Sequence, residues 1–168
     1  AQAVARRHTS RWRELSRLIP VAWPAKSLDG EVVTLTDSHL DQDGVLKPET
    51  VRLLLQHKRL VGISFRNTSI SNLDALADLK QRLRLLDLYG TRTDDAALEA
   101  IGTFSALQEL DLGVTRVTPA GLAHLKPLRQ LRILDLSGRR ITDRAITSLK
   151  PLKSLTHLSL AGPRITDI

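Results

Sequence analysis

The chain repeats one pattern of apolar and polar positions at a fixed interval. Copies of the pattern begin at Leu83, Leu107, Leu131 and Leu155, and each start lies 24 residues after the one before. A looser copy over residues 60–82 is one residue shorter. Because each copy supplies only one strip of apolar residues, it can bury that strip only against its neighbours. The pattern therefore predicts a solenoid of stacked coils, not a globular domain around one deep pocket.

The spacing inside one copy predicts a strand followed by a short helix. Leu134 and Leu136 are two residues apart, so a strand points both to one face and Asp135 to the other. The last apolar residues of the copy, Ile146, Leu149 and Leu152, recur at helical spacing. Each coil is therefore expected to contain a strand, a turn, a short helix and a return loop. Parallel strands are predicted near residues 61–65, 84–88, 108–112, 132–136 and 156–160.

Each copy reads L-x-x-L-x-L-x-x-T-x-I/V, and over residues 60–168 this pattern resembles the leucine-rich-repeat family. The continuation T-x-I-T-D-x-x-L is most similar to bacterial repeats of the kind abundant in planctomycetes. It is also similar to the cysteine-containing subtype, with a different residue at the cysteine position. The resemblance implies an α/β solenoid in which a curved parallel β-sheet carries short helices on its convex side. It implies protein binding but no particular partner, because the family binds many unrelated proteins.

The copies depart from this pattern at two positions. The threonine position holds Thr68, Thr91 and Thr115 and then Arg139 and Pro163. Thr93 stands where other copies have isoleucine or valine, which is expected to weaken the core of that coil. Threonines that precede proline or aspartate, such as Thr118 and Thr142, are expected to cap the helices and not to act in catalysis.

Residues 29–59 are expected to form a degenerate capping repeat ahead of the repeats at 60–168. Val33 and Leu35 follow the spacing of the later strands, and Pro48 suits the first turn of a helix through Gln56. The loop 41–44 invites a calcium-site interpretation. Its spacing excludes that interpretation, because His39 and Thr50 would occupy the first and the bidentate ligand positions.

The chain has a net charge of +7, and most of that charge lies in residues 1–28. Residues 1–19 predict a basic amphipathic helix that ends at Pro20. Two roles are open for it: covering the first coil, or docking on anionic lipid, nucleic acid or an acidic partner. The residues proposed for an anionic surface are Arg6, Arg7, Arg11, Arg13 and Arg17.

The outward side of the predicted strands is the candidate binding face, because solenoids offer an extended curved surface. Its middle position carries three aspartates, which are expected to be solvated, with Arg84 and Arg132 as counter-charges. Tyr89, the one tyrosine of the chain, is expected to be exposed and to anchor a partner. The candidate protein-binding residues are Arg84, Asp87, Tyr89, Glu109, Asp111, Arg132, Asp135, His157 and Ser159.

The sequence predicts no catalytic, cofactor-binding or metal-binding residue. It contains no cysteine, its five histidines are scattered, and it has no glycine-rich phosphate loop. The predicted function is that of a non-enzymatic protein–protein interaction module, or scaffold, that uses the concave face. The alternative is an accessory subunit of a larger or membrane-associated complex, docked through the basic N-terminal helix. A substrate receptor of ubiquitin-ligase type is less favoured, because residues 1–59 do not resemble an F-box. The sequence does not indicate a compartment.

The last copy ends soon after its strand, which predicts an open apolar end. Leu149, Leu152, Leu158, Leu160 and Ile165 are expected at or near that end. A terminal coil normally needs a polar cap, because its outer side is a cross-section of the core. This end is therefore expected to be covered by a second copy, another subunit or residues outside this sequence.

Overall fold

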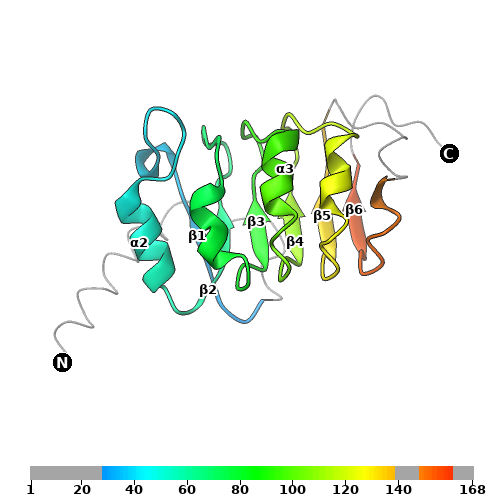
Figure 1. Cartoon of the computed structure of the whole chain (residues 1–168), viewed down its shortest axis with the longest axis horizontal. Coiled ribbons are helices and arrows are strands. Elements are labelled where there is room, and N and C mark those ends of the chain that lie inside the picture. The colour runs from blue at the N-terminus through cyan, green and yellow to red at the C-terminus, as the bar shows by residue number, and fades with distance from the viewer. Residues whose placement is uncertain (1–27, 139–147, 161–168) are drawn as a thin grey trace.

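The computed structural model of the chain describes residues 28–138 and 148–160 (Figure 1). Its strands form one six-stranded sheet in the order β1 to β6, and all five neighbouring pairs run parallel. The strands are β1 (Glu31–Thr34), β2 (Leu60–Ser64), β3 (Leu85–Asp87), β4 (Glu109–Asp111), β5 (Ile133–Asp135) and β6 (His157–Ser159). Strand order therefore follows chain order, as stacked coils require.

The helices of the described residues lie together on one side of this sheet (Figure 1). They are the α-helices α2 (Pro48–Gln56) and α3 (Asp95–Ile101) and the 3₁₀ helices η2 (Asp37–His39), η3 (Asp74–Leu79) and η4 (Gly121–Leu125). The helix expected from Pro48 through Gln56 is present. The predicted α/β leucine-rich-repeat solenoid, with short helices on the convex side, is confirmed.

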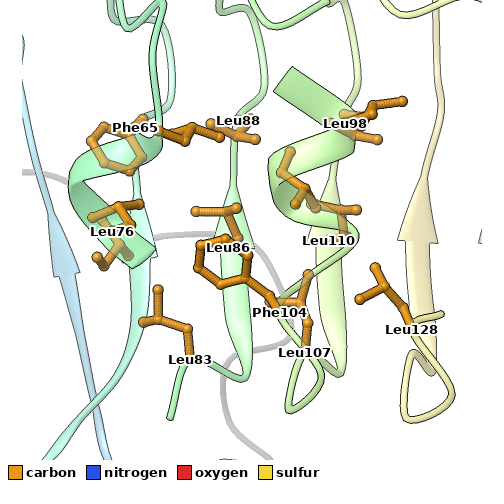
Figure 2. Packing of buried hydrophobic residues seen from close by; sticks show 14 of the residues in the cluster. Phe65, Leu76, Leu83, Leu86, Leu88, Leu98, Phe104, Leu107, Leu110 and Leu128 are labelled. Atoms are coloured by element: carbon orange, nitrogen blue, oxygen red, sulfur yellow. The ribbon is translucent and has the colours of Figure 1, made fainter. Parts of the chain in front are cut away.

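The core is the stack of equivalent leucines between the sheet and the helices. Leu86 and Leu110 of the strands face Leu76 and Leu98 of the helices, and all four are fully buried (Figure 2). Burial of one such side chain contributes about 1.5–3 kcal/mol. Because each coil buries its apolar strip against its neighbours, truncating Leu110 would remove packing contacts within its own coil and with the coils on both sides.

The coils that contain β2, β3, β4 and β5 each turn away from the strand at a residue with positive φ. This repeat position holds Asn67, Gly90, Val114 and Gly138, with φ values of 58°, 70°, 55° and 155°. Glycine and asparagine tolerate the left-handed region, whereas a β-branched residue there is strained. Val114 is also 55% exposed, so little apolar burial offsets the strain.

Threonine hydroxyls inside the coils are satisfied locally. The side chains of Thr68, Thr91 and Thr115 each donate to the carbonyl three residues earlier, at 2.6–2.7 Å. Thr93 is 3% exposed, and its hydroxyl lies 2.8 Å from that of Thr91. Thr93 therefore places no unsatisfied hydroxyl in the core, although it does supply less apolar surface than isoleucine.

Helix capping differs from the sequence prediction. Asp94 caps α3 by accepting from the N–H groups of Ala96 and Ala97 at 3.1 and 3.2 Å. Thr118 instead donates its hydroxyl to Asp95 at 2.6 Å and accepts from Ala120 N–H at 3.3 Å. Helix η4 begins only at Gly121, so the prediction of Thr118 as the cap residue is wrong.

The C-terminal coil is less open than predicted. Leu149 and Leu152 are each 5% exposed, so the expectation that they lie at an open end is wrong. Leu158 is 37% exposed, and Leu160 is partly buried against the core. Thr142, Arg139, Pro163 and Ile165 lie outside the described residues. The cover expected over this end, and the domain boundaries at 28/29 and 59/60, stay predictions.

Candidate functional site

One residue from each of the strands β2 to β6 stacks into a polar column along the outward face of the sheet. The strand register aligns Ser64 with Asp87, Asp87 with Asp111, Asp111 with Asp135, and Asp135 with Ser159. Neighbouring strands are about 4.8 Å apart, so three carboxylates follow one another at short range. We call these five residues the polar column.

Each aspartate of the polar column uses one carboxylate oxygen to hold its own turn. The Oδ1 atom accepts a hydrogen bond from the backbone N–H two residues later, an arrangement that aspartate commonly makes at turns. The distances are 3.1 Å from Asp87 to Tyr89 N, 2.9 Å from Asp111 to Gly113 N and 2.7 Å from Asp135 to Ser137 N. The aspartates therefore stabilise the end of each strand, which is a structural role.

The second oxygens of Asp87 and Asp111 are both occupied by one arginine, Arg66. Its Nε atom donates to Asp87 Oδ2 at 3.0 Å, and its Nη2 atom donates to Asp111 Oδ2 at 2.7 Å. Ser64 donates its hydroxyl to the same Asp87 oxygen at 2.8 Å. One guanidinium group, just after β2, therefore bridges the ends of β3 and β4.

Tyr89 supports this guanidinium group from beneath. The Arg66 guanidinium carbon lies 4.4 Å from the centroid of the Tyr89 ring, a favourable cation–π distance. Gly113 leaves room for the ring, since a Cβ at Gly113 would lie 2.8 Å from Tyr89 Cδ2. Tyr89 is half-buried, so the prediction that it is exposed is wrong, while its role as an anchor for a partner stays a prediction.

Several predicted contact residues are buried. Asp87, Asp111 and Glu109 are 0%, 1% and 2% exposed. The prediction that the aspartates are solvated is therefore wrong for Asp87 and Asp111. Their counter-charge was also assigned wrongly. Neither Arg84 nor Arg132 forms an ion pair with an aspartate among the described residues, and Arg66 takes that role for Asp87 and Asp111. Sequence reasoning missed Arg66 because Tyr89, Gly113 and Ser137 hold the equivalent position in the next three coils.

Burial changes the acidity of the central aspartate. Loss of water contact raises the pKa of Asp111 from 3.8 to about 6. The Gly113 N–H opposes this change, while the negative charges of Asp87 and Asp135 reinforce it and that of Arg66 opposes it. Part of the Asp111 population is therefore protonated in mildly acidic solution.

The C-terminal half of the same face is more open. Asp135 is half-buried, and its Oδ2 atom has no partner among residues 28–138 and 148–160. Arg132, which directly precedes β5, and His157 and Ser159, which lie on β6, are exposed. Arg84 is half-buried. The structure therefore divides the predicted residues into a buried set and an accessible C-terminal set.

The described residues offer neither a metal site nor a membrane-spanning helix. Residues 28–138 and 148–160 contain no group of three or more histidine, aspartate or glutamate residues arranged to hold a metal ion. Within those ranges, no helix has the length and apolar character needed to cross a membrane. The proposed anionic-surface residues, Arg6, Arg7, Arg11, Arg13 and Arg17, lie outside the described residues.

Comparison with solved structures supports the fold. The chain is similar to an internalin, inlF, of Listeria monocytogenes, at 24% identity and a TM-score of 0.54 over 65% of this chain and 31% of that one. It is also similar to internalin C2 of the same organism, at 24% identity and a TM-score of 0.60 over 81% of this chain and 54% of that one. The chain thus spans about a third and about half of the lengths of these two proteins. No family model and no curated protein matches the sequence. The fold that these observations define is the leucine-rich-repeat solenoid.

Proposed function

We propose that this chain is a non-enzymatic protein-binding module and that its partner contacts the C-terminal half of the concave face. A solenoid of this kind offers a broad curved surface, which suits another protein better than a small molecule. The contact set is Arg132, Asp135, His157 and Ser159, with Arg84 and Tyr89 at its border. Asp87, Glu109 and Asp111 lie beneath the surface and support it.

The observation that carries this proposal is the difference between Asp135 and the two aspartates before it. Arg66 occupies the free oxygens of Asp87 and Asp111, whereas Oδ2 of Asp135 has no partner among the described residues. Asp135 adjoins exposed groups that can donate or accept hydrogen bonds. A charged partner group would therefore find one accessible carboxylate oxygen on a rigid strand.

Site-specific photo-crosslinking tests this assignment. A photoreactive residue at His157 is compared with one at His124, which is exposed on η4 on the opposite side of the sheet. Cell extract is the source of partner, and the crosslinked products are identified by mass spectrometry. We expect His157 to give a defined product that His124 does not give.

A second variant connects that product to the proposed contacts. Replacing Arg132 and His157 by alanine should weaken binding of the crosslinked partner by at least tenfold, because exposed interface residues contribute unevenly and a few dominate. Both side chains are exposed, so stability should change by no more than about 0.5 kcal/mol. Equal crosslinking from His124, or unchanged affinity of the double variant, would place the contact on another surface.

A further inference from the structure

The segments that connect each helix to the following strand lie along one edge of the solenoid. They cover residues 57–59, 80–84, 102–108, 126–132 and 150–156. Figure 2 shows Leu83, Leu107 and Leu128, which belong to three of these segments, along the same edge of the sheet. Because coils stack in register, residues far apart in sequence become neighbours there.

Positive charge is concentrated on this edge. The described residues contain 15 basic and 15 acidic side chains, so their net charge is zero. The five segments nevertheless hold ten of the basic side chains and none of the acidic ones. We call this set the basic edge: Lys58, Arg59, Lys80, Arg82, Arg84, Lys126, Arg129, Arg132, Lys150 and Lys153.

The charges of the basic edge are largely not neutralised within the described chain. Eight of the ten side chains are exposed; Arg82 and Arg84 are half-buried. Arg59 is the one member with an ion-pair partner among the described residues: its Nε lies 3.5 Å from Glu31, which also contacts His57 at 3.1 Å. Arg82 and Arg129 donate only to backbone carbonyl groups, of His57 and Pro151.

We propose that the basic edge docks on the surface of an anionic lipid bilayer. Loops along one edge of a solenoid can all contact a flat membrane surface, so the positive charges of several coils can attract the anionic headgroups simultaneously. Several basic residues recur at equivalent repeat positions, so the stacked coils present rows of positive charge that suit an extended anionic surface. The recurring pairs are Lys126 and Lys150, Arg129 and Lys153, and Arg84 and Arg132. Each lysine or arginine close to an anionic membrane strengthens binding by about fivefold.

The apolar content of the five segments argues for this partner over single-stranded nucleic acid. Phe104 is 1% exposed and the side chain of His57 is 10% exposed, so these segments offer no well-exposed ring to stack on bases. The leucines of these segments are buried or partly buried, and none is exposed. The edge would therefore rest on the lipid headgroups without insertion, and its binding would be strongly weakened by salt.

This docking would orient the molecule. The strands run away from the basic edge, so they would stand upright on the membrane with their carboxyl ends outward. The concave face would then remain open at the side. Arg84 and Arg132 belong both to the basic edge and to the protein-binding contact set. Lys80, Lys126 and Lys150 lie outside that set, so replacing these three lysines tests the membrane proposal separately from the protein-binding function.

The experiment uses the full chain and sedimentation with vesicles of phosphatidylcholine alone or with 30% phosphatidylserine. The edge variant carries Lys80→Glu, Lys126→Glu and Lys150→Glu. The matched control carries Arg52→Glu, Arg92→Glu and Arg116→Glu, which change the net charge equally at exposed positions away from the edge. We expect binding only to the phosphatidylserine vesicles, a loss of at least tenfold in the edge variant and a loss of less than threefold in the control.

Three results would overturn the proposal. Equal losses in both variants would show that only net charge matters. Binding that the edge variant retains would assign the interaction to another segment of the chain. Binding to duplex DNA or RNA, without binding to the vesicles, would identify the edge as a nucleic-acid surface. Circular dichroism of both variants checks that the fold is intact in each case.

Discussion

The Nη2 atom of Arg66 lies 2.7 Å from Oδ2 of Asp111, although 45 residues separate them in the chain. The Nε atom of the same side chain lies 3.0 Å from Asp87, on the strand between. One ion-pair network, with buried carboxylates and a partly exposed guanidinium group, therefore joins the ends of three consecutive strands. Asp87 and Asp111 are therefore part of the structural framework. The candidate binding surface is accordingly the part of the face formed by β5 and β6.

Two aspartates at equivalent repeat positions should respond differently to charge reversal. Asp87→Lys places a second cation against Arg66 in a fully buried position, so it should lower the free energy of unfolding by at least 3 kcal/mol. Asp135→Lys, at a half-buried position without an ion pair, should lower it by about 1 kcal/mol through loss of the Ser137 hydrogen bond. Urea denaturation measures both values. Similar losses for the two variants would mean that the network does not distinguish the two positions.

The raised pKa of Asp111 predicts an unusual pH dependence of stability. The folded-state pKa of about 6 exceeds the ordinary value of 3.8, so between these values the folded protein binds a proton that the unfolded chain does not. The contribution of Asp111 to stability is therefore complete below pH 3.8 and is lost as the pH rises through 6. Relative to Asp111→Asn, which cannot titrate, the wild-type chain should gain about 1–2 kcal/mol between pH 7.5 and pH 5.

Urea denaturation of the wild-type chain and Asp111→Asn across this pH range isolates the effect, because the other titrating groups are common to both. A stability difference that stays constant with pH would show that Asp111 titrates normally. A difference that moves in the opposite direction would show that Arg66 dominates over burial.

The strained turn at Val114 offers a stabilising substitution. Asn67 holds the same repeat position with φ of 58°, close to the 55° of Val114. Because asparagine tolerates this region and valine does not, Val114→Asn should raise the free energy of unfolding by about 1 kcal/mol. Thermal denaturation measures the gain, and Val45→Asn serves as a control at a position without positive φ. A loss of stability in Val114→Asn would show that the exposed valine makes a contact that matters.

The repeat pattern predicted the strands and the core because those features recur in every coil. Alternation placed Leu134 and Asp135 on opposite faces, and the structure agrees. The alternation of apolar and polar residues along a strand does not show which side chains from other coils cover the polar face of the sheet. Arg66 covers part of the polar column from a position that other coils fill with Tyr89, Gly113 and Ser137, so no repeated residue pointed to it. Solvated aspartates were therefore predicted where buried ones occur.

Charge was similarly difficult to interpret from composition. A count over the repeats gives nearly equal numbers of acidic and basic residues, which predicts no charged surface. The coils place most basic residues in the segments before the strands and several acidic ones on the strands themselves. The separation of basic from acidic residues becomes visible only when the structure places Lys126 on one edge of the solenoid and Asp111 on the outward face of the sheet.

The central claim is that Arg66 and Asp111 act together to hold the concave face, and a double-mutant cycle tests it most directly. Arg66→Leu should cost at least 3 kcal/mol in the wild-type chain, because it leaves buried carboxylates without their cation. In the Asp111→Asn background that cost should fall by about 1–3 kcal/mol, whereas in the Asp135→Asn background it should change by less than about 0.5 kcal/mol. Equal costs of Arg66→Leu in all three backgrounds would contradict the account.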